Sequence, residues 1–132
     1  MESLSLQTEE GPLATTLDRL LELLKTNPQM IEFQDVMTKI NGHYDYTPVQ
    51  FSNGTGEDLL INHAGENEGS CKIFAFAKLH GLGEKETLAC FGKYYREDVL
   101  KHPQGLNHLN IRTFMRHGWR GIQFENPALS SK

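Results

Sequence analysis

Long apolar runs are missing from this sequence of 132 residues. The longest one, residues 73–77, is far shorter than the ~20 residues that a transmembrane helix needs. The first ten residues also lack the basic and apolar segments of a secretory signal peptide. We therefore expect neither a membrane span nor a membrane partner.

Cysteine is also scarce, because the chain has only Cys71 and Cys90. Two cysteines are too few for the disulfide framework of a small secreted domain, so they indicate a reducing compartment. His102 and His108 have a spacing found in zinc fingers, but no Cys-x2-Cys pair accompanies them. No metal site and no cofactor is therefore expected.

A basic excess, typical of nucleic-acid-binding proteins, is missing as well. The chain has 13 Lys and Arg against 17 Asp and Glu, a net charge of −4, so no nucleic-acid partner is expected. The charge is uneven, however. Residues 99–124 contain no Asp or Glu but do contain Lys101, Arg112, Arg116 and Arg120. This segment is a basic region on an acidic protein.

What is present indicates one globular domain, with 38% hydrophobic and 23% charged residues. Apolar residues recur at helical spacing in five segments, residues 15–25, 33–40, 70–80, 84–99 and 107–117. Short strands are expected at residues 47–51, 59–61 and 122–124, and the second could pair with the first across a turn at Asn53-Gly54. The expected fold is α+β, a compact single domain of about five helices around a small antiparallel sheet.

The domain should span residues 12–126. Residues 1–11 are rich in Ser, Thr, Gln and Glu and are expected to form a flexible N-terminal tail. Residues 127–132 are expected to form a C-terminal tail. The sequence leaves the oligomeric state open.

Cys71 is the first candidate for chemistry, because it follows Gly69-Ser70 at the expected start of a helix. Helix N-termini stabilise a thiolate, as in papain-like and transglutaminase-like enzymes. His80 would lie ~13.5 Å away on the same helix, too far to serve as a base. His117, followed by Gly-Trp, is the preferred base, and His108 is the alternative. Alternatively, Ser70 only caps the helix and Cys71 is a small buried residue.

The loop before Cys71 is the second candidate. Gly69, Ser70 and Lys72 lie in a stretch that superficially resembles a phosphate-binding loop. Its spacing differs from that motif, and Glu66 and Glu68 would repel phosphate. The alternative is a structural turn that leads into a helix.

The third candidate is a basic stripe. His108, Arg112 and Arg116 are four residues apart and would share one helix face. Such a stripe could bind a small anionic ligand or an acidic patch on a partner protein. Alternatively, it is a solvated face whose arginines pair with the protein's own carboxylates.

Several segments resemble the HopJ type III effector protein family. They are residues 43–48 (HYDYTP), 67–81 (NEGSCKIFAFAKLHG), 87–99 (TLACFGKYYREDV) and 108–119 (HLNIRTFMRHGW). The similarity covers nearly everything from the first expected helix to Phe124.

The resemblance implies a bacterial protein, located in the cytoplasm or delivered into a host cell by type III secretion. It assigns no catalytic residues. The leading hypothesis is therefore that the protein binds a host or bacterial protein, or a small anionic ligand. The alternative is a cysteine-dependent hydrolase or acyltransferase with Cys71 as the nucleophile and His117 as the base.

Overall fold

A computed structural model describes residues 16–132, and the expected N-terminal tail lies outside this range. The main helices are α1 (Leu17–Thr26), α2 (Phe33–His43), α3 (Glu68–Leu79), α4 (Glu84–Ala89), a π-helix (Tyr94–Val99) and α5 (Leu109–His117). Short 3-10 turns lie at Pro28–Met30, η3 (Gly56–Asp58) and Gly118–Gly121. No helix in this part of the chain has the length and hydropathy required to cross a membrane.

Within residues 16–132, five short strands form two antiparallel sheets. They are β2 (Tyr44–Tyr46), β3 (Phe51–Asn53), β4 (Leu60–Asn62), β5 (Gln123–Phe124) and β6 (Leu129–Ser131). One sheet has the order β4-β3-β5 and the other pairs β2 with β6. The fold is therefore α+β with antiparallel sheets, as the sequence predicts, although two small sheets replace the single one expected.

The strand boundaries differ from those expected. β3 begins at Phe51 rather than residue 47, since the segment before it contains Pro48, which has no N–H for a ladder. Residues 127–132 are not a tail. β6 pairs with β2, and Ala128 and Leu129 are buried, so the packed domain extends past residue 126.

The helix expected over residues 84–99 is interrupted. α4 ends at Ala89, and Gly92 takes a left-handed φ of 58°. A Cβ atom there would lie 2.7 Å from the backbone nitrogen of Phe33, so both the backbone conformation and the close approach require glycine. The chain then continues as the π-helix.

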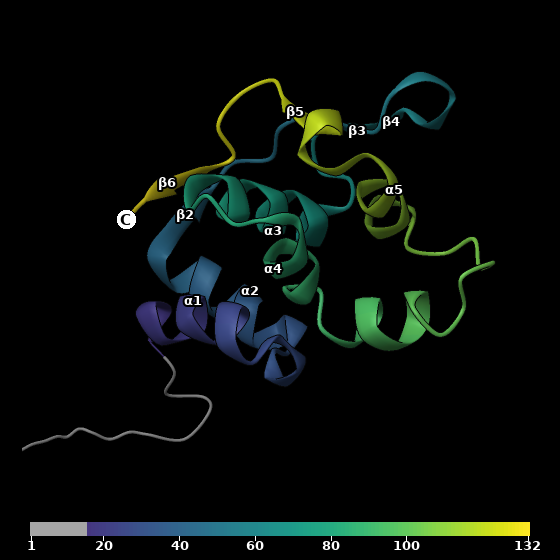
Figure 1. The fold of residues 1–132 in the computed structure, drawn as a ribbon. Coiled ribbons are helices and arrows are strands. Elements are labelled where there is room, and N and C mark those ends of the chain that lie inside the picture. The colour runs from purple at the N-terminus through teal and green to yellow at the C-terminus, as the bar shows by residue number, and fades with distance from the viewer. Residues whose placement is uncertain (1–15) are drawn as a thin grey trace, which may run out of the picture.

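Helix α3 is central because its middle segment, Ile73 to Ala77, is buried on all sides. Figure 1 shows α3 between the α1–α2 pair and the two sheets, with α5 beside β3. Phe74 is fully buried, and its ring packs against four other aromatic rings within 6.4 Å, those of Phe51, Phe91, Phe114 and Trp119. This aromatic cluster joins α3 to the sheet and to α5.

Candidate binding site

Cys71 lies inside the protein, only 1% exposed. Helix α3 begins at Glu68 with Asn67 as its N-cap, so Ser70 is not the cap and Cys71 belongs to the second turn. Burial raises the pKa of the Cys71 thiol, and the nearby Tyr46 hydroxyl and Val49 backbone only partly oppose this. The thiol is therefore shielded and protonated, the opposite of an activated nucleophile.

His117 is held away from Cys71 by other partners. Its Nε2 lies 2.9 Å from Asp58 Oδ2, and its Nδ1 lies 3.2 Å from Thr55 Oγ1. Both ring nitrogens are thus engaged with the segment around η3. The structure does not bring the two predicted catalytic residues together.

The thiols should therefore be inert in the folded protein. We expect iodoacetamide to modify Cys71 and Cys90 at least about tenfold more slowly than in the denatured chain, because both are buried and reaction needs local opening. Because the pKa of Cys71 is raised, a plot of its modification rate against pH should have its inflection at a higher pH than that of a free thiol. Peptide mass spectrometry across a pH series measures both rates. Rapid labelling of Cys71 alone at neutral pH would contradict this.

Arg112 is only 7% exposed and takes no part in a surface stripe. Its guanidinium donates to the backbone carbonyls of Asn107 (2.6 Å), His102 (2.8 Å) and Asp98 (3.3 Å), and to Asn107 Oδ1 (2.8 Å). These hydrogen bonds fix the loop between the π-helix and α5. Arg112 therefore has a structural role here, and the predicted ligand-binding role is not supported.

The other predicted cations are also engaged within the protein. Arg116 Nε lies 3.3 Å from Asp58 Oδ2. Lys72 donates to Asn41 Oδ1 at 3.0 Å and lies 4.8 Å from the centroid of the Tyr46 ring. The Arg116 side chain is still half exposed, whereas the free basic face expected along α5 is not formed.

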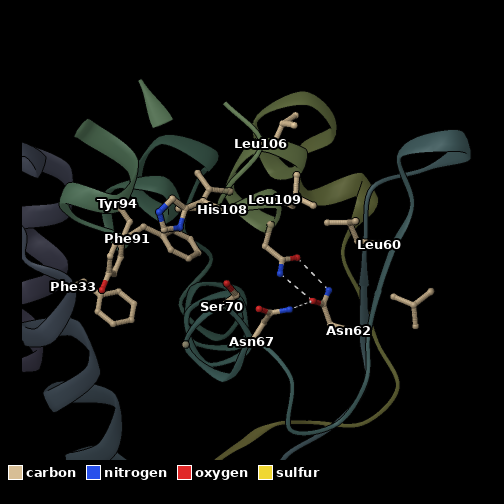
Figure 2. A pocket seen from close by; sticks show the side chains of 14 residues that line it. Phe33, Leu60, Asn62, Asn67, Ser70, Phe91, Tyr94, Leu106, His108 and Leu109 are labelled. Atoms are coloured by element: carbon tan, nitrogen blue, oxygen red, sulfur yellow. Dashed lines mark hydrogen bonds between the residues drawn. The ribbon is translucent and has the colours of Figure 1, made fainter. Parts of the chain in front are cut away.

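Three of the predicted binding residues, Gly69, Ser70 and His108, do meet at a pocket of about 590 Å³ (Figure 2). This volume falls within the range of small-molecule sites. The pocket lies between the starts of α3 and α5, with β4 on one side. The residues that complete its lining are Phe33, Leu60, Ile61, Asn62, Asn67, Phe91, Tyr94, Leu106, Leu109, Asn110 and Ile111.

Two unusual backbone conformations lie at this pocket. Asn67 and His108 have φ values of 50° and 53°, and they are the non-glycine residues with positive φ within residues 16–132. They are the N-caps of α3 and α5, and neither side chain caps its helix. Left-handed backbone at non-glycine residues costs energy and concentrates at functional sites.

The first turns of both helices leave donors free at the pocket. In the described chain, the backbone N–H groups of Gly69 and Ser70 in α3, and of Asn110 and Ile111 in α5, donate to no protein acceptor. Helix starts always leave such groups, which water, side chains or a ligand must satisfy. Two helix starts that line one pocket make its floor rich in donors.

Asparagine amides form the polar wall. Asn62 and Asn110 exchange hydrogen bonds of 3.1 and 2.9 Å, and the Asn67 amide donates to Asn62 Oδ1 at 2.7 Å (Figure 2). Behind them, the fully buried Asn53 amide donates to Asn110, and its Oδ1 has no partner. This network ties β3, β4 and α5 together, so the wall is preorganised.

Aromatic rings form the opposite wall. Tyr94 packs edge-on against Phe33, with 5.1 Å between ring centroids, and lies 5.2 Å from the His108 ring. His108 Nε2 lies 3.0 Å from Asp98 Oδ2, which orients the imidazole. Within the described part of the chain, none of the residues that line the pocket is Lys, Arg, Asp or Glu. Its walls therefore favour a group with apolar surface and at most a small charge.

The described residues offer no metal centre, since no group of three or more His, Cys, Asp and Glu side chains within 16–132 could hold an ion.

The site combines a donor-rich floor, a wall of amides and an aromatic wall. Such an arrangement can bind and orient a ligand. It contains no activated nucleophile of the kind that the sequence suggested at Cys71.

Comparisons with known proteins agree with the sequence resemblance. The family model for the HopJ type III effector protein matches residues 17–129. The crystal structure of VPA0580, a protein of unknown function, is similar to this chain, with 52% sequence identity and a TM-score of 0.83, over 88% of this chain and 93% of that one. No curated protein matches the chain. The chain belongs to the HopJ type III effector protein family.

Proposed function

We propose that the protein acts by binding, and that the pocket between α3, α5 and β4 is where it binds. The observation that carries this is the convergence of two uncapped helix starts on one pocket, each with a left-handed N-cap residue. The donors favour oxygen acceptors of a ligand, such as a carbonyl or a carboxylate. The aromatic wall favours an apolar body.

The absence of Lys and Arg from the pocket lining narrows the ligand class. A polyanion such as a nucleotide phosphate normally needs cationic side chains, whereas helix N-termini and one imidazole are enough for a neutral or singly charged group. A small anionic ligand therefore fits only if it carries a single negative charge. Because the family is described as type III effectors, the proposal includes delivery into a host cell.

The pocket can be tested by NMR with isotope-labelled protein and a library of small carboxylates and amides. We expect a ligand that binds in the pocket to shift the amide resonances of four residues together, those of Gly69, Ser70, Asn110 and Ile111. Ser70 is half buried and lines the pocket. Ser70→Leu should fill the pocket and weaken binding more than about tenfold, ~1.4 kcal/mol.

Ser130→Leu provides the matched control, because Ser130 is exposed in β6, outside the pocket. It should bind like the wild type. If library members cause shifts elsewhere, or if Ser70→Leu binds them equally well, the pocket is not the binding site.

A further inference from the structure

The outer edge of β4 forms one rim of the pocket. β4 is the end strand of the β4-β3-β5 sheet, and within residues 16–132 no strand pairs with its outer side. Natural edge strands are usually protected by charged residues, proline, a bulge or their shortness, and of these β4 has only its length of three residues. Leu60, Ile61 and Asn62 contain neither charge nor proline. No charge or proline within the strand therefore opposes pairing of this edge with a short extended segment of another chain.

Apolar side chains continue from this edge around the pocket. Ile61 is 45% exposed, Leu109 48% and Leu106 85%, and all three line the pocket. Figure 2 shows Leu60, Leu106 and Leu109 gathered at one side of the pocket, opposite Asn67 and Ser70. These exposed apolar side chains are concentrated around one pocket beside an unpaired strand edge. Such a concentration indicates an interaction surface rather than scattered surface residues.

Acidic residues flank β4 on both sides along the chain. Glu57 precedes the strand and Glu66 follows it, and both are exposed. Antiparallel pairing of two copies about Ile61 would bring the η3 turn of one copy, which holds Glu57, toward the turn of the other copy that holds Glu66. Like charges brought together across strands are destabilising, so these residues disfavour a second copy as the occupant.

We propose that an extended peptide segment of a partner protein binds along β4 as an added strand, with basic residues flanking an apolar one. The apolar side chain enters the pocket and the basic residues face Glu57 and Glu66. Main-chain hydrogen bonds to the edge would supply affinity, and the pocket would supply specificity, as in other strand-addition complexes. The inference rests on the proposed function, because it assigns an occupant to the same pocket.

The test is selection from a displayed library of random seven-residue peptides. Enriched peptides should share an apolar centre with flanking Lys or Arg, and replacing both basic residues with Glu should weaken binding at least tenfold. N-methylation of alternate peptide nitrogens keeps the side chains but removes the donors needed for strand pairing. It should weaken binding by a similar factor.

Two leucine variants locate the surface on the protein. Leu106→Ser should weaken binding of the selected peptide at least tenfold without loss of folding, because the side chain is 85% exposed. Leu79→Ser is the matched control, since Leu79 is 57% exposed but lies outside this pocket. It should bind like the wild type.

Four results would overturn the inference: no enriched peptide, binding that is insensitive to N-methylation, equal effects of the two leucine variants, or self-association through β4 that Leu106→Ser abolishes. The proposed function is judged separately. Small carboxylates or amides that shift Gly69 and Asn110, with no enriched peptide, would support the pocket and reject the peptide.

Discussion

Replacing Arg112 with methionine should lower the free energy of unfolding by about 3 kcal/mol. Methionine matches much of the aliphatic volume but donates no hydrogen bond. The carbonyls of Asp98, His102 and Asn107 would lose a charged donor, and hydrogen bonds to charged groups are among the strongest in proteins. Urea unfolding followed by Trp119 fluorescence measures the loss.

Arg116→Met is the control for this experiment. Its side chain is half exposed and its ion pair with Asp58 is solvated, so the loss should stay below about 1 kcal/mol. Hydrogen exchange should also report faster opening of residues 98–107 in the Arg112 variant than in the Arg116 variant. Equal losses of stability for both would refute the structural role assigned to Arg112.

Replacing Phe74 with alanine should lower the free energy of unfolding by about 4 kcal/mol. The side chain is fully buried, and its ring lies 5.0 Å from that of Phe114 and 5.6 Å from that of Phe91. Its removal would leave a cavity that helices on two sides can fill only by moving. Thermal and urea unfolding should both show the change.

Phe124→Ala is the comparison for the core experiment, because Phe124 is half buried at the edge strand β5. It should lose less than half as much stability as the Phe74 variant. If the two losses were the same, the aromatic cluster around Phe74 would not be the main source of core stability.

Local patterns predicted the helices and one hairpin well. α1, α2, α3 and α5 each begin or end within a few residues of the expected positions, and β3 pairs with β4 as expected. Apolar spacing carries this information because each element buries one face. The break at Gly92 was missed, since Leu88, Phe91, Tyr95 and Val99 keep a helical spacing across it. The pairing of β6 with β2 could not be predicted from residue patterns, because the two strands are three residues long and lie far apart in the sequence.

The site was predicted only in part. Gly69 and Ser70 lie at the pocket, because the start of a helix can be recognised from the sequence. His108, predicted as part of a basic stripe, lies there because α5 starts at the pocket. Spacing alone does not show which side chains turn inward. The buried position of Cys71 was only the alternative to a nucleophile, and Arg112 was expected on an exposed stripe, although it is 7% exposed.

The asparagines of the pocket wall were missed altogether. Asn62, Asn67 and Asn110 are common residue types in polar segments, and nothing in the sequence marks them as neighbours. Only the fold joins them, through hydrogen bonds between β4, the start of α3 and α5.

The π-helix has a consequence for the geometry of this protein. The Leu100 N–H bonds to the Tyr95 carbonyl, five residues back, so this turn carries one residue more than an ordinary α-turn. Deleting a single residue between Tyr95 and Asp98 would close this wide turn to an ordinary α-turn and leave the residues on either side in register, whereas inserting a further residue would rotate the later side chains by about 100°. Asp98 would then turn away from His108. The wide turn thus accommodates one residue while Asp98 keeps its contact with His108, and a second added residue would leave the imidazole without this partner.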